Sequence, residues 1–113
     1  MDTDERQFLK TAAWLFMRHG RPPRALAVCD ALVEDDPRDG ISAAAAAGLL
    51  LDAGAPERAL EILRQADMPP SLSHVEAVLE TRALKALGRT AESSARWKRH
   101  LESKKGPARQ WTA

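Results

Sequence analysis

The 113-residue chain contains one cysteine, Cys29, no tyrosine, three tryptophans and two phenylalanines. A single cysteine cannot form an internal disulfide, so the composition excludes a disulfide-stapled scaffold and suits a reducing compartment. No apolar run approaches the roughly 20 residues needed to span a bilayer. The acidic start, MDTDERQF, lacks the apolar core of a signal peptide. We therefore expect a cytoplasmic protein that does not insert into membranes.

The chain also lacks an excess of charge of either sign. Seventeen lysines and arginines against sixteen aspartates and glutamates leave a net charge of +1, so no long-range field favours nucleic acid or a membrane surface. With 44% hydrophobic and 29% charged residues, the composition is typical of a globular protein. At this length we expect one domain over residues 1–113, with a core large enough to fold without staples.

The residue types that carry catalysis and bind metals are scattered. His19, His74 and His100 are far apart, and none has a second candidate ligand three or four residues away. No predicted strand leads into a glycine-rich phosphate-binding loop. Cys29 lies on an apolar helical stripe with no neighbour that would lower its pKa. We expect no enzymatic activity, no metal and no cofactor.

What the sequence does contain is an internal repeat. Gly20, Gly54 and Gly88 are equally spaced along the chain, and the segments GRPPRALAVCDAL and GAPERALEILRQA align without a gap. The spacing is about 34 residues, the length of a tetratricopeptide repeat, which is a helix-turn-helix unit. Three such units are the usual minimum for a stable stack. The predicted fold is therefore all-α, a short right-handed solenoid of three tetratricopeptide-type repeats at about 6–39, 40–73 and 74–107.

Helical spacing agrees with this register. Apolar residues at 25, 28, 29 and 32 follow the i, i+3, i+4, i+7 pattern, as do those at 59, 62, 63 and 66. Each repeat glycine is expected to end a helix in the left-handed conformation. Ser73 and Glu76 have the spacing of a capping box. Six helices are predicted near 4–19, 23–35, 40–53, 56–66, 73–87 and 90–103, followed by a flexible tail over 104–113.

Five consecutive alanines lie in the third predicted helix, within the segment ISAAAAAGLLLDAG at 41–54. Alanine has the highest helix propensity, so this run is a helix and not a linker. Short side chains allow close approach of whatever lies against them. We therefore expect the run to deepen the concave groove of the solenoid.

The first helix of each repeat should line this groove, and equivalent positions recur once in every repeat. The groove is then apolar at its middle, with an aromatic anchor on one side and positive charge at its ends, which is typical of a peptide-binding surface. Its predicted residues are Gln7, Lys10, Trp14, Met17, Ile41, Ala44, Gly48, Leu51, Val75, Val78, Arg82 and Lys85.

Two of these positions allow a second interpretation. Trp14 is either the aromatic anchor of the groove or a core residue, as large aromatics often are. A glycine in the middle of a helix costs about 1 kcal/mol relative to alanine. Gly48 is therefore explained either by close contact with a bound partner or by tight packing against the neighbouring outer helix.

The chain as a whole resembles a particular family. It opens with RQFLKTAAWLFMRHGRPPRALAVCDALVEDDP, and the resemblance rests on Gln7, Leu9, Trp14–Leu15, Gly20, Arg24–Ala25, the DALVEDDP segment and the stretch from Gly88 to Trp97. Together these features resemble the YscY-type chaperones of bacterial type III secretion systems over residues 6–104. The alanine-rich third helix and Ser93, in place of alanine, depart from the pattern.

The resemblance implies a function that the repeat alone does not. Such chaperones hold a small secreted subunit, the YscX-type protein, in a one-to-one heterodimer, and the pair then engages the cytosolic part of the export gate. The client's apolar helical segment would lie in the groove, with Arg82 and Lys85 binding its acidic residues.

Two other functions remain open at this point. The same fold could be a self-associating scaffold whose groove takes its own first helix or a second copy. The basic segment RWKRHLESKK, at 96–105, could bind RNA. The other interpretation of that segment is the polar outer face that a terminal solenoid helix needs, and we expect no nucleic-acid partner.

Overall fold

Six α-helices and one short 3-10 helix follow one another along the chain in a computed structural model, which describes residues 1–108 and their side chains as far as residue 104. The predicted all-α class is confirmed for these residues, which contain no β-strand. The elements are α1 (Thr3–Arg18), α2 (Pro22–Asp35), α3 (Gly40–Asp52), α4 (Pro56–Gln65), η1 (Pro70–Leu72), α5 (Ser73–Ala86) and α6 (Thr90–Ala108).

The three repeat glycines end α1, α3 and α5 in the same way. Gly20, Gly54 and Gly88 have φ of 69°, 81° and 77°, which is the left-handed region that glycine tolerates best. In each turn the glycine N–H donates to the carbonyl three residues back, and the next N–H donates to the carbonyl five residues back, with N···O distances of 2.8 to 3.2 Å. This pair of bonds satisfies carbonyls that a helix end would otherwise leave unpaired.

The predicted helix ends are confirmed to within one residue, except in α6. That helix continues to Ala108 instead of ending at 103. The remaining part of the predicted flexible tail, 109–113, lies outside the described residues. Pro22 and Pro56 are the first residues of α2 and α4, where a missing N–H breaks no helical hydrogen bond.

The predicted capping box at the start of α5 is wrong. Leu72 is the N-cap residue and makes no side-chain capping bond, because η1 runs directly into α5 and takes the place of a cap. Glu76 instead faces α6, where its carboxylate lies 3.5 Å from the Arg96 guanidinium.

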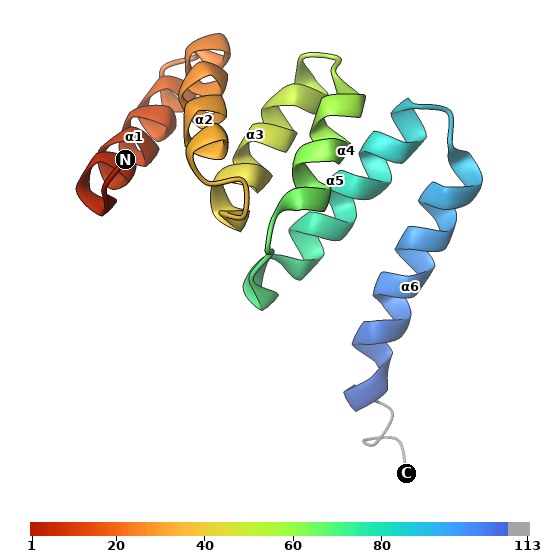
Figure 1. The fold of residues 1–113 in the computed structure, drawn as a ribbon. Helices are drawn as coiled ribbons and strands as arrows, with labels where there is room; N and C mark the ends of the chain where they lie inside the picture. The colour runs from red at the N-terminus through yellow and green to blue at the C-terminus, as the bar shows by residue number, and fades with distance from the viewer. Residues whose placement is uncertain (109–113) are drawn as a thin grey trace.

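The helices form three antiparallel pairs, α1 with α2, α3 with α4 and α5 with α6, arranged in a row with α1 and α6 at opposite ends (Figure 1). Consecutive pairs join through α2 with α3 and through α4 with α5, and α3 also lies beside α5. The row is elongated, with extents of 50 × 32 × 25 Å. The central helix, α3, therefore has neighbours on three sides.

The alanine run mainly allows neighbouring helices to pack closely against α3. Ala43, Ala46 and Ala47 have no exposed surface and belong to the main core with residues of α2 and α4. Small side chains let three helices approach α3 closely, which large ones would prevent. The expectation that the run deepens a groove therefore applies to one alanine, Ala45, which is exposed and lines a cavity.

Gly40, the first residue of α3, lies against the segment that follows α4. A Cβ there would be 2.5 Å from the Asp67 carbonyl oxygen and 2.8 Å from Pro69 Cδ. The Asp67 N–H donates to the Arg38 carbonyl at 2.9 Å and fixes this approach. A side chain at Gly40 would force the two segments apart.

Candidate functional site

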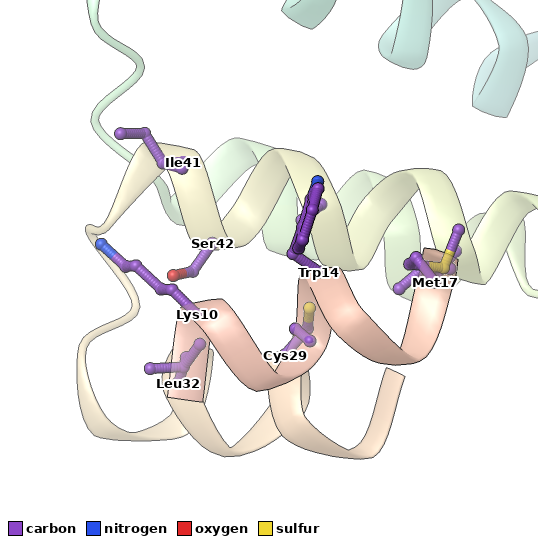
Figure 2. A pocket seen from close by; sticks show the side chains of 10 residues that line it. Lys10, Trp14, Met17, Cys29, Leu32, Ile41 and Ser42 are labelled. Carbon is purple, nitrogen blue, oxygen red and sulfur yellow. The ribbon is translucent and has the colours of Figure 1, made fainter. Parts of the chain in front are cut away.

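An open cavity of about 370 Å³ lies between α1, α2 and α3. In Figure 2, α1 and α3 form its two walls and Cys29 and Leu32 of α2 lie below them. Lys10 and Ile41 are at one end, Trp14 stands between the two walls, and Met17 is at the other end. The remaining lining residues are Ala13, Ser42, Ala45 and Leu49. Apart from Lys10 and Ser42, these side chains are apolar, so the cavity suits an apolar group.

Three large apolar side chains stand exposed around this cavity. Trp14 and Ile41 are each 57% exposed, and Met17 is exposed as well. Trp14 is therefore a surface residue at the cavity and not part of the core. The guanidinium of Arg18 lies 5.2 Å from the centre of its ring, within cation–π range. A group of exposed apolar side chains around a concavity often marks a site where a partner binds.

A polar network holds the Lys10 end of the cavity. Asp39, the N-cap residue of α3, accepts hydrogen bonds from the Ser42 N–H at 3.2 Å and the Ser42 hydroxyl at 2.7 Å. It also accepts from Arg6, and Lys10 Nζ lies 3.3 Å away. Arg6 donates further to Asp35 at 2.6 Å, near the end of α2. The network therefore ties α1 to both α2 and α3.

Burial of Asp39 opposes its ionisation, but hydrogen bonds from Ser42 and Arg6, with a smaller effect from Lys10, outweigh burial and hold the pKa of this carboxyl well below its ordinary value. The carboxylate is therefore ionised at any physiological pH. The Lys10 ammonium at the cavity rim is then partly neutralised from within the protein.

The cysteine lies on the cavity floor. Cys29 is 3% exposed and belongs to the core, and its burial, with the nearby charge of Asp30, raises the pKa of the thiol. A thiol that stays protonated is a poor nucleophile, so Cys29 contributes shape and apolar surface to the cavity.

The twelve residues predicted for the groove fall into three groups. Lys10, Trp14, Met17 and Ile41 line the cavity. Leu51, Arg82 and Lys85 line a separate, more open hollow of about 300 Å³ at the far ends of α3 and α5. The other five are placed on the same three helices but line neither space: Gln7 and Val75 are exposed, and Ala44, Gly48 and Val78 are half-buried.

Gly48 has no tight neighbour. A Cβ at this position would have Leu79 Cδ2 of α5 as its nearest described neighbour, at 4.0 Å, which is ordinary van der Waals contact. There is room for a methyl group, and the nearest neighbour, Leu79, lies on α5, which is the first helix of its pair and not an outer helix. The explanation by tight packing against an outer helix is therefore wrong.

Prediction by the repeat period missed the cavity residues Ala13, Ser42, Ala45 and Leu49. The period assigns equivalent faces to α1, α3 and α5, but α3 presents a face turned by one residue, 45 instead of 44, toward α1. The missed α2 residues, Cys29 and Leu32, lie on the apolar stripe that was expected to be buried. The apolar stripe could be recognised in the sequence, but the cavity next to it could not.

A second cluster joins α5 and α6. His74 Nδ1 lies 3.1 Å from His100 Nε2, and the Trp97 ring is 5.8 Å and 5.5 Å from the two imidazole centres. Burial, followed by the charges of Lys104, His74 and Arg96, lowers the pKa of His100. The two histidines are 26 positions apart in the sequence, which hid this pair from sequence reasoning. Among the described side chains, no three metal-ligand residues gather closely enough to hold a metal ion.

The basic segment at 96–105 is partly engaged in packing. Arg96 lies 3.3 Å from Glu80 and 3.5 Å from Glu76, both on α5, and its side chain is largely buried. His100 is buried as well. These two residues join α5 to α6, which leaves Lys98, Arg99 and Lys104 as the exposed cations of the described part of the segment.

No protein-family model matches this chain, and no curated protein matches it either. In the described part of the chain, no helix has the length and apolar character needed to cross a membrane.

Proposed function

We propose that the chain is a three-repeat tetratricopeptide-type adaptor that binds an apolar helical segment of a partner protein. The observation that carries the proposal is the open apolar cavity between α1 and α3, with Trp14, Met17 and Ile41 exposed around it. The repeat assignment is supported by three evenly spaced glycine turns, each closed by the same pair of hydrogen bonds. Stacked helix pairs of this kind commonly present such a surface to peptides.

Within that class, the proposed role is that of a YscY-type secretion chaperone in the cytoplasm. The support is the resemblance of residues 6–104 to that family, together with a groove of suitable chemistry. The client would be a small secreted subunit of the YscX type, held one to one and presented with the chaperone to the export gate.

The geometry gives this proposal a binding mode. An apolar side chain of the client would enter the cavity over Cys29 and Leu32, between Trp14 and the α3 wall. The helix carrying it would extend toward α5, where the exposed Lys85 is available to an acidic residue. Affinity would come mainly from buried apolar area, and the charges would set orientation and register.

The proposal is tested by light scattering after size-exclusion chromatography, on the chain alone and after co-expression with each small reading frame next to its gene. A chaperone should be poorly soluble or self-associated alone and should form a one-to-one complex with one neighbour. A single, stable homo-oligomer that ignores every neighbour would contradict the chaperone role.

A self-associating scaffold is the second candidate. The exposed apolar side chains at the cavity favour it, because a free chain would otherwise present them to water. In this case the groove of each copy would be filled by another copy. The light-scattering experiment separates the two, since a filled groove would not bind a neighbour's product.

A further inference from the structure

Large apolar side chains are left uncovered at both ends of the row of helices. On α1 these are Phe8, 72% exposed, and Leu15, 43% exposed. They are separated by two helical turns and so lie on one side of the helix, whereas Trp14 and Met17 face the cavity. On α6, at the other end (Figure 1), Leu101 is 40% exposed.

Positions one repeat apart show which helices cover the equivalent face of α3 and α5. Leu49 and Ala83 of α3 and α5 correspond to Leu15, and both are buried. Leu49 belongs to the core cluster against which Leu26 of α2 packs, and Ala83 clusters with Leu60 of α4. At this face, α3 and α5 are thus each covered by the second helix of the preceding pair. The face of α1 lacks such a helix among the described residues.

The outer side of α6 is the matching surface. Leu101 corresponds to Val33 of α2, which is 6% exposed because α3 follows it. Ser94 corresponds to Leu60, and it is exposed where Leu60 is buried. No helix follows α6 among residues 1–108, so its stacking face is uncovered in the same way as that of α1.

The charges beside these two faces are of opposite sign. Asp4 and Glu5 border Phe8 at the start of α1. Lys98 and Lys104 are exposed about one turn before and after Leu101 near the end of α6, and they outnumber the exposed Glu102 beside it. Successive helices in this fold are antiparallel (Figure 1), so the end of α6 from one copy would meet the start of α1 from another. Acidic and basic side chains would then face each other across the apolar contact.

We propose that two copies of this chain associate head to tail, with α6 of one copy covering the Phe8–Leu15 face of α1 in the next. The contact repeats the stacking of α2 on α3 between molecules. It uses two different faces, so each added copy leaves one face of each kind free, and short chains of copies form. The contact is separate from the cavity and does not depend on what the cavity binds.

The test uses two full-length variants, each blocking one face. Phe8→Lys places a cation on the acidic face, and Leu101→Glu places an anion on the basic face. Both positions are exposed, so thermal melts should match the wild type. In sedimentation velocity the wild type should grow beyond a dimer with concentration, and each variant alone should associate at least about tenfold more weakly.

Mixing the two variants gives the decisive result. Each retains the face that the other has lost, so the mixture should form a complex of two chains and grow no further. The matched control, Ala27→Lys at an exposed position on α2, should associate as the wild type does.

Three results would overturn the proposal. These are a wild-type chain that stays monomeric at the highest soluble concentration, variants that associate alone as strongly as the wild type, and a mixture that stays monomeric. If Ile41→Lys abolished association while Phe8→Lys did not, the copies would join through the cavity and the head-to-tail contact would be wrong.

Discussion

Arg6 of α1 donates a hydrogen bond to Asp39, the N-cap residue of α3, across 33 positions of sequence. The pair joins the first helix to the third at the Lys10 end of the cavity, while the Met17 end lacks such a tie among the described residues. The cavity therefore has one fixed end and one open end. A partner helix could enter over Met17 without breaking this network.

Replacing Asp39 with asparagine should lower the free energy of unfolding by about 2 kcal/mol at neutral pH, because the charge-assisted bonds to Arg6 and Lys10 lose their anion, although asparagine can still cap α3. Urea denaturation measures this. Asp52→Asn is the matched control, since its pair with Arg82 is exposed and should contribute less than about 1 kcal/mol. Equal losses in both variants would contradict the structural role of the network.

The same aspartate gives a prediction for acid. Its pKa is lower in the folded chain than in the unfolded one, so its contribution is fully present above the unfolded pKa, about 3.9, and is lost as the pH falls below that value. The difference in unfolding free energy between wild type and Asp39→Asn should therefore be constant from pH 7 to about 5 and shrink toward pH 2. A difference that did not change in this range would contradict it.

The two glycines of α3 should respond in opposite ways to alanine. Gly48→Ala should raise the unfolding free energy by about 1 kcal/mol, because a methyl group has room there and alanine favours the helix. Gly40→Ala should lower it by roughly 1 to 3 kcal/mol, because its Cβ would collide with the Asp67 carbonyl. Thermal or urea melts of the two variants decide this. Destabilisation by Gly48→Ala would indicate tight packing around that residue.

Gly48→Leu tests how far the groove extends beyond the cavity. Its side chain would project from α3 toward Leu79 of α5, where the client helix is proposed to continue. We expect partner binding to be lost while the melt stays close to that of the wild type. Full binding with a normal melt would confine the binding site to the cavity between α1 and α3.

His100 should make the chain less stable in mild acid. The folded pKa of His100 is below its ordinary value, so the unfolded chain binds more protons, and stability falls as the pH drops below about 6.5. Lys104 and Arg96 lie close enough to disfavour the extra charge. Urea melts at pH 7.5 and 5.5 should show a smaller loss of unfolding free energy for His100→Gln than for the wild type. Equal losses in the two proteins would contradict the assignment.

Local signals in the sequence were sufficient to predict the helices. Glycine in the left-handed conformation and proline at a first position act over a few residues, so Gly20 and Pro56 could be interpreted without the fold. The one capping error, at Ser73, arose because η1 precedes α5 and removes the need for a cap.

The site was predictable only in part. Lys10, Trp14, Met17 and Ile41 follow from the repeat period, which assigns them to the first helices of the pairs. The cavity itself depends on how far α1 stands from α3 and on a rotation of α3 that favours Ala45 over Ala44. Such quantities arise from packing between distant segments, as do the Arg6–Asp39 and His74–His100 contacts, and no local pattern encodes them.

The central claim is that the cavity between α1 and α3 binds the partner, and Ala45→Phe tests it most directly. Ala45 is exposed at the cavity wall, so phenylalanine should fill the space without disturbing the core. Ala27→Phe, at an exposed alanine of α2 outside the cavity, is the control. Each variant would be co-expressed with the small reading frame that forms a complex with the wild type, and the mass of the complex measured by light scattering. We predict loss of the complex for Ala45→Phe and a one-to-one complex for Ala27→Phe, and an intact complex with folded Ala45→Phe would contradict the account.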